Sequence, residues 1–118
     1  KALNPVGVEG KIEGGVAMGV GYSLLEEVKL KQNGLWTNNL TEYLLPTTLD
    51  TPKIKSIILE HPEPSGPFGA RGMAEMSMSP VAPAVVNAIR DATGKTLSRI
   101  PIQAEKLMEE EPVQRDNA

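Results

Sequence analysis

The 118-residue sequence predicts an α+β fold in which helices and short strands surround one long irregular loop. Three observations lead to this class. Apolar residues recur at helical spacing near the start of the chain and again after residue 80, and a β-branched run occupies residues 54–60. No periodic pattern holds between residues 61 and 79, and so long a stretch without secondary structure is often functional.

Residues 10–28 are expected to form a helix that is rich in glycine. Ile12, Val16 and Leu24 follow helical spacing, while glycines occupy positions 10, 14, 15, 19 and 21. Each glycine costs up to ~1 kcal/mol relative to alanine in a helix interior. Something must therefore approach this helix closely enough to compensate. The sequence leaves open whether that is another part of the backbone or a bound cofactor.

A β-hairpin and at least one further strand should follow this helix. Residues 28–31 and 35–37 flank residues 32–34, whose Asn-Gly pair is a strong hairpin signal. Residues 40–46 are expected to be irregular or to form a short helical turn. Residues 54–60 are β-branched and mostly apolar, which predicts a strand buried on at least one face.

A capped amphipathic helix should follow the long loop. Ser79 is the expected N-cap, Pro80 fits the first turn, and Gly94 closes an apolar stripe that runs from Ala84 to Ala92. Residues 100–108 are expected to be a short strand end and a helical turn. Residues 109–118 form an acidic and polar tail, which is expected to be disordered.

Composition excludes several classes of function. The formal net charge of −3, with no basic face, argues against binding to nucleic acid. The absence of cysteine excludes disulfides, iron–sulfur ligation and thiolate zinc sites within this chain, and the expected location is cytoplasmic. The apolar stretch over residues 14–25 is too short to span a membrane. Serine hydrolysis is not expected, because no nucleophile elbow surrounds Ser23, Ser65, Ser77 or Ser79.

The loop from Gly66 to Glu75 carries the most information about function. It consists mainly of glycine, proline and small residues and ends in a carboxylate. Its glycines permit a ligand to approach the main chain. Methionines flank Glu75, so its side chain is expected to be at least partly buried, and a carboxylate in such a place is either paired or functional. Arg71 could form a local ion pair with Glu75, or it could contact an anion.

Three blocks of sequence, in the right order, resemble the C-terminal part of the molybdopterin-binding (large) subunit of the xanthine dehydrogenase and aldehyde oxidase family. The first comprises Asn4-Pro5, Gly10-Lys11-Ile12-Glu13-Gly14-Gly15, Met18-Gly19-Val20-Gly21-Tyr22 and Glu26-Glu27. The second is the loop from Gly66 to Glu75, and the third comprises Pro80, Ala82-Pro83-Ala84, Asn87-Ala88-Ile89 and Asp91-Ala92-Thr93-Gly94. Pro101 with Glu105-Lys106-Leu107 resembles the closing turn of the family.

The resemblance implies a fold and an activity. Residues 1–108 would be the C-terminal portion of a larger molybdopterin-binding domain, followed by the tail. The activity would be the molybdenum-dependent hydroxylation of an N-heterocycle such as a purine, or of an aldehyde, with water as the source of oxygen. Glu75 matches the catalytic glutamate of the family and would act as general base, a role that needs the fixed position that a glycine-rich loop can supply.

The resemblance also implies where the cofactor lies. Molybdenum–molybdopterin would contact Lys11, Gly14, Gly72, Met73 and Ala74, and no residue of this chain would ligate the metal directly. The family often has glutamine at the position of Lys11 and glycine at the position of Ala74. A lysine can donate a hydrogen bond but cannot accept one, so this contact differs from the one that the family makes.

The partners would be the remaining molybdopterin-binding domain or subunit, iron–sulfur and flavin subunits, and a small-molecule substrate. Iron–sulfur clusters and FAD are expected only on other domains or subunits. The chain would be a fragment or a small subunit, inactive by itself. One alternative is a non-catalytic structural or assembly subunit that retains the fold. The other is an unrelated α+β binding domain.

Overall fold

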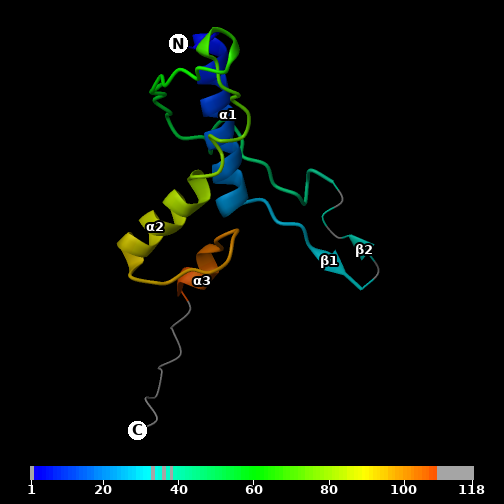
Figure 1. The fold of residues 1–118 in the computed structure, drawn as a ribbon. Helices are drawn as coiled ribbons and strands as arrows, with labels where there is room; N and C mark the ends of the chain where they lie inside the picture. The colour runs from blue at the N-terminus through cyan, green and yellow to red at the C-terminus, as the bar shows by residue number, and fades with distance from the viewer. Residues whose placement is uncertain (1, 33, 36, 38, 109–118) are drawn as a thin grey trace.

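The structure, a computed structural model, describes residues 2–32, 34, 35, 37 and 39–108. In chain order it contains helix α1 (Pro5–Leu24), strands β1 (Leu30–Lys31) and β2 (Gly34–Leu35), a short 3-10 helix (Pro67–Gly69), α2 (Val81–Thr93) and α3 (Ala104–Met108). Helix α2 packs beside α1, and the hairpin projects away from both helices (Figure 1).

Helix α1 begins at Pro5 and ends at Leu24, whereas the sequence predicted residues 10–28. The start is earlier because the Asn4 side chain caps the helix: its Oδ1 accepts a hydrogen bond from the Gly7 N–H at 3.0 Å. Proline in the first turn fits this start. At the other end the Leu25 N–H donates to the Gly21 carbonyl at 2.8 Å, and no further turn follows.

Protein atoms occupy the space beside four of the six glycines of α1, and at Gly7 they belong to the capping Asn4. A methyl group at Gly15 would overlap the Ser77 side chain, and one at Gly19 would overlap Val81 at the start of α2. A methyl group at Gly21 would lie 2.6 Å from Pro46. Beside Gly10 and Gly14, in contrast, there is no atom within 4 Å. Close packing against the chain itself therefore explains only part of the glycine content of α1.

The second helix, α2, ends as predicted but begins differently. Gly94 adopts a left-handed conformation with φ 74°, and its N–H donates to the Arg90 carbonyl at 2.7 Å. The N-cap is Pro80 rather than Ser79, and no side chain caps the first turn. The expected helical turn near the end of the described chain is α3, but no strand end precedes it among the described residues.

The hairpin pairs Leu30 with Leu35 and Lys31 with Gly34 in antiparallel register. Gly34 has φ 124°, a conformation that glycine adopts readily. The expected turn residue Asn33 and the expected strand residue Trp36 lie outside the described residues.

Residues 54–60 do not form a strand, so this part of the α+β prediction is wrong for the described chain. A strand requires a neighbour that supplies backbone hydrogen bonds. The two described strands pair only with each other. The regular secondary structure of the described chain is therefore helical apart from one short hairpin.

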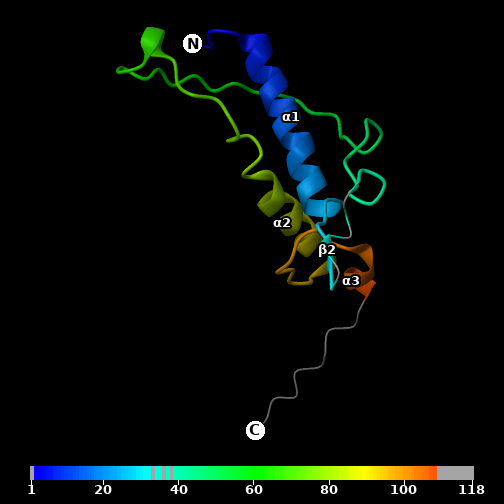
Figure 2. The ribbon, with the colours of Figure 1, turned by 90° about the vertical axis from the view of Figure 1, so that its right-hand side faces the viewer.

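The described elements enclose very little apolar core. Ile102, 7% exposed, is the single buried apolar side chain among the described residues. The radius of gyration is 19.1 Å, whereas a compact domain of this length has about 13 Å. Figure 2 shows the long green segment crossing the N-terminal half of α1 rather than folding over α2. The shape is elongated and open.

The glycines of α1 should respond differently to alanine. Gly19→Ala should destabilise the α1–α2 pair by about 1–3 kcal/mol, because its methyl group overlaps Val81. Gly10→Ala should stabilise α1 by up to ~1 kcal/mol, because its methyl group meets nothing. Circular dichroism at increasing denaturant concentration measures both changes. Equal effects of the two variants would contradict this account of the packing.

Candidate functional site

A cavity of about 480 Å³ lies between the start of α1, the extended segment that ends near His61 and the glycine-rich loop. Its volume is within the range of small-molecule sites, roughly 300–1,000 Å³. Three of the predicted site residues line it, namely Lys11, Gly72 and Met73. The polar side chains on its wall are Asn4, Lys11, Glu60, His61 and Arg71.

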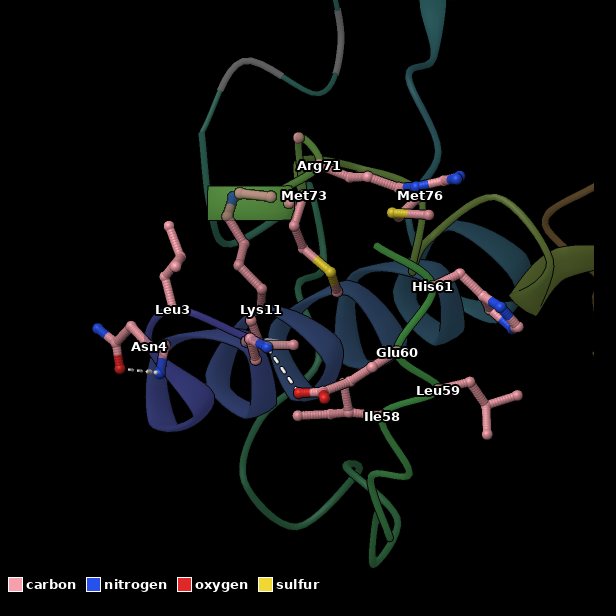
Figure 3. A pocket seen from close by; sticks show the side chains of 16 residues that line it. Leu3, Asn4, Lys11, Ile58, Leu59, Glu60, His61, Arg71, Met73 and Met76 are labelled. Carbon is pink, nitrogen blue, oxygen red and sulfur yellow. Dashed lines mark hydrogen bonds between the residues drawn. The ribbon is translucent and has the colours of Figure 1, made fainter. Parts of the chain in front are cut away.

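The walls of the cavity come from three separate segments. Figure 3 shows Lys11 projecting from α1, Glu60 from the extended segment and Arg71 from the loop. The Ala2 N–H donates to Glu60 Oε1 at 2.6 Å, which holds the extended segment against the start of the chain. The Lys11 ammonium has no hydrogen bond or ion pair with any described residue, so its three donors are available to a ligand.

Arg71 pairs with Glu63 and not with Glu75. The Arg71 guanidinium lies 3.5 Å from Glu63 Oε2, and both side chains are partly exposed. The local ion pair between Arg71 and Glu75 that the four-residue spacing allowed is therefore absent from the described structure. An ion pair as exposed as that of Arg71 and Glu63 stabilises a protein by less than about 1 kcal/mol, so Arg71 can turn toward an anion at little cost.

Glu75 is exposed, and the expectation of a partly buried carboxylate is wrong for this chain. Of the flanking methionines, Met76 is exposed, whereas Met73 and Met78 are half-buried, and they leave Glu75 open to solvent. Glu75 is also not among the residues that line the cavity. Its carboxylate makes no hydrogen bond or ion pair with the described residues.

The turn that carries Glu75 is attached to α1 by Ser77. The Ser77 hydroxyl donates to the Lys11 carbonyl at 3.0 Å, and Gly15 leaves room for this close approach. Within the turn the Met78 N–H donates to the Glu75 carbonyl at 3.0 Å. The helix that presents Lys11 to the cavity thus also holds the Glu75 turn in place. Sequence reasoning missed this role because it considered Ser77 only as a nucleophile.

The structure therefore brings together only part of the predicted site. Gly14 and Ala74 do not line the cavity. Gly14 and Gly72 share one property, since a methyl group added to either would meet no atom within 4 Å. Asn4 and His61 line the cavity without having been predicted. The N-cap pattern of Asn4-Pro5 could have indicated the position of Asn4, but no sequence signal indicated that of His61.

The loop between the extended segment and Glu75 contains an uncommon backbone conformation. Phe68 has φ 54°, which is rare for a residue with a side chain, and its ring is 92% exposed. A strained residue of this kind costs on the order of 1–3 kcal/mol and is frequent near functional sites.

Two side chains with shifted pKa values lie away from the cavity. The hydrogen bond from the Tyr43 hydroxyl to Glu26, at 2.7 Å, raises the pKa of Tyr43. Hydrogen bonds from Thr47 lower the pKa of the Asp50 carboxyl. In the described part of the chain no three His, Cys, Asp or Glu side chains are grouped so as to hold a metal ion. No described helix is both long and apolar enough to cross a membrane.

Comparisons with known proteins show that the sequence of this chain is similar to segments of molybdenum enzymes. Residues 1–52 match the family described as molybdopterin cofactor-binding domain. The chain is 37% identical over 110 residues to the xanthine dehydrogenase molybdenum-binding subunit of Escherichia coli O157:H7, covering 92% of this chain and 15% of that protein. It is 34% identical over 109 residues to the aldehyde oxidoreductase of Megalodesulfovibrio gigas, covering 90% of this chain and 12% of that protein.

A solved structure shows the same arrangement of the chain. The crystal structure of quinoline 2-oxidoreductase from Pseudomonas putida 86 superimposes with a TM-score of 0.83 and 40% identity, over 90% of this chain and 14% of that one. In sequence and in fold the chain is therefore similar to one segment of these molybdenum-binding subunits and oxidoreductases. The chain belongs to the xanthine dehydrogenase and aldehyde oxidase family. It spans less than one sixth of the length of these relatives.

The hydroxyl of Ser77 should slow hydrogen exchange in the Glu75 turn. Ser77→Ala removes one hydrogen bond, which contributes about 1 kcal/mol, so the Met78 and Val81 amides should exchange about fivefold faster. Ser65→Ala is the matched control, because the Ser65 hydroxyl bonds only to the nearby Glu63. Hydrogen exchange followed by NMR measures both variants. Unchanged rates at Met78 in Ser77→Ala would show that Ser77 does not hold the turn.

Proposed function

We propose that this chain is the glutamate-bearing portion of a molybdenum hydroxylase and that Glu75 is its general base. One observation carries the proposal: the Glu75 carboxylate is free of partners on a turn that Ser77 attaches to the same helix that presents Lys11 to the cavity. Residues 1–108 would form one portion of a larger molybdopterin-binding domain. Iron–sulfur and flavin groups would lie on other domains or subunits.

The residues of the cavity fit a molybdopterin. The cofactor carries phosphate and ring carbonyl acceptors, and the Lys11 ammonium offers three donors that no described residue uses. The backbone at Gly72 is open to close approach, because no atom lies within 4 Å of where its side chain would begin. Met73 provides an adaptable apolar surface for a planar ring system. Lys11, Gly72 and Met73 would therefore hold the cofactor in this chain, with Gly14 and Ala74 nearby.

The proposed chemistry places a hydroxyl group on an electron-poor carbon of the substrate. The oxygen comes from water, and two electrons and two protons leave the substrate and water together. Molybdenum–molybdopterin, when bound, supplies the redox centre that takes the two electrons. Glu75 would accept one proton at a carboxylate oxygen, and its attachment through Ser77 would keep that oxygen at a constant position.

The substrate class follows from the same chemistry. A carbon next to a ring nitrogen and an aldehyde carbon are both electron-poor enough to accept the oxygen of water. We therefore propose an N-heterocycle, such as a purine, or an aldehyde. The location would be cytoplasmic.

A second candidate is a non-catalytic structural or assembly subunit that retains the fold. Two observations favour it: Lys11 stands where the family often has glutamine, and Glu75 does not line the cavity. The glycine-rich loop that ends in Glu75 matches the loop of the family that ends in its catalytic glutamate, which favours the catalytic role. Substitution of the carboxylate separates the two candidates.

Lys11 should contribute to cofactor binding in the assembled enzyme. Lys11→Met keeps most of the side-chain volume but removes a charged donor worth about 1.5–3 kcal/mol, so molybdopterin affinity should fall about 10- to 100-fold. Lys11→Gln should retain most of the binding, because an amide can also donate. Lys53→Met is the control, since Lys53 is exposed and does not line the cavity. Metal and pterin analysis of the purified enzyme gives the readout, and full occupancy in Lys11→Met would exclude this contact.

Glu75→Gln should remove the base and keep the shape of the turn. The expected result is a fall in kcat of about 10²- to 10⁴-fold with unchanged molybdenum content, because general-base catalysis contributes that much. Glu105→Gln is the control, because Glu105 lies exposed on α3 and away from the cavity. Steady-state kinetics of the assembled enzyme decides the result. Full activity of Glu75→Gln would leave the structural candidate in place.

A further inference from the structure

The charged side chains on the cavity wall do not balance one another. Lys11 and Arg71 bring two positive charges, whereas Glu60 is the only carboxylate among the described lining residues. Glu60 already accepts a hydrogen bond from the Ala2 N–H at 2.6 Å. The chain as a whole carries a formal net charge of −3, so the excess of positive charge belongs to this cavity and not to the whole surface. The cavity therefore favours an occupant with negative charge.

Arg71 is held at this wall by a partner that lies outside the cavity. Its guanidinium is 3.5 Å from Glu63 Oε2, and Glu63 does not line the cavity. Glu63 is also the only partner of Arg71 in the described part of the chain. A guanidinium presents several N–H donors in a fixed fork, and a charge-assisted hydrogen bond is normally shorter, about 2.7–2.9 Å. Most of the donor capacity of Arg71 is therefore left for another acceptor.

The Glu63 carboxylate does not depend on Arg71. Its other oxygen, Oε1, accepts a hydrogen bond from the Ser65 hydroxyl at 2.9 Å. The backbone of Glu63 is fixed as well, because its N–H donates to the Gly69 carbonyl at 3.0 Å and its carbonyl accepts from the Gly66 N–H at 3.0 Å. The Glu63 side chain is 39% exposed, so water can replace the guanidinium at Oε2. Arg71 can thus leave Glu63 without creating a buried charge or opening the loop.

Arg71 is next to residues that the proposed function uses. Gly72 and Met73 follow it directly on the cavity wall, and Glu75 comes four residues later on the same loop. A molecule that contacts Gly72 and Met73 has the Arg71 side chain beside it. An anion that Arg71 binds is therefore part of the molecule in the cavity.

We propose that Arg71 is an anion-binding residue of this cavity, and that it leaves Glu63 to bind a negatively charged oxygen group of the molecule held there. The group is a carboxylate of the substrate or a phosphate of the cofactor, since both offer the paired oxygens that a guanidinium binds through two donors. The inference rests on the proposed function in one respect, that a small molecule occupies the cavity. Glu63 then competes with that molecule for Arg71.

Two variants with opposite expected effects test the contact in the assembled enzyme. Arg71→Met removes the donors, whereas Glu63→Gln removes the competing charge and keeps an oxygen that can accept from Ser65. Equilibrium dialysis compares the binding of pyridine-3-carboxylate with that of its uncharged amide, which has nearly the same size. The preference for the carboxylate should fall at least about tenfold in Arg71→Met. It should rise about two- to fivefold in Glu63→Gln, because the lost ion pair is exposed and weak.

Pterin analysis of the same variants separates the two sources of the anion. If the anion is a carboxylate of the substrate, the dialysis result changes and the molybdopterin content does not. If the anion is the phosphate of the cofactor, the molybdopterin content of Arg71→Met falls at least about tenfold. In that case Glu63→Gln retains the full content, since it frees Arg71 for the phosphate.

The directions of these effects distinguish an anion contact from an ion pair that only stabilises the loop. A stabilising pair predicts the same loss in Arg71→Met and Glu63→Gln, and parallel losses in both variants would overturn the inference. Arg71→Lys keeps the positive charge and should retain part of the binding that Arg71→Met loses. Arg90→Met, at an exposed position on α2 away from the cavity, is the control and should change neither quantity.

One further outcome would overturn the inference. It is an unchanged molybdopterin content in Arg71→Met, combined either with an unchanged preference for the carboxylate or with no binding of either probe. The outcomes are also distinct from a failure of the proposed function. Full activity of Glu75→Gln overturns the proposed base but leaves the opposite effects of Arg71→Met and Glu63→Gln in place.

Discussion

Close contact between α1 and the segment that leads into α2 is the interaction on which the rest of the structure depends. Gly15 and Gly19 leave the surface of α1 low enough for Ser77 and Val81 to reach it. The hydrogen bond from Ser77 to the Lys11 carbonyl joins residues far apart in the chain. Because the Glu75 turn and α2 follow one another directly, this single contact positions both.

The side of α1 that carries Gly10 and Gly14 is not covered by the described part of the chain. Gly10 and Gly14 face open space, and charged residues on this helix are limited to Glu9, Lys11 and Glu13. A helix that is apolar around most of its circumference is normally buried in the core of a larger protein. Much of the surface of α1 and the Glu75 carboxylate are therefore left exposed by the described part of the chain.

Much of the local structure and part of the candidate site could be predicted from the sequence. The antiparallel pairing of Leu30 and Lys31 with Leu35 and Gly34 and the helix end at Gly94 each depend on neighbouring residues, so both could be predicted from local sequence. The family resemblance predicts cofactor contacts for Lys11, Gly72 and Met73, and these three residues line one cavity. The N-cap pattern of Asn4-Pro5 also indicates the start of α1, whereas the hydrophobic spacing predicted a start at residue 10.

The amino-acid sequence by itself determined the elements whose signals lie within a few residues, together with the chemical groups available for a site. Only the tertiary structure decided that Arg71 pairs with Glu63, that Glu75 stays exposed and that Ser77 attaches its turn to α1. These outcomes depend on the path of the chain between distant residues, which no local pattern encodes. The strand expected over residues 54–60 shows the same limit, because β-propensity is realised only where another strand supplies the hydrogen bonds.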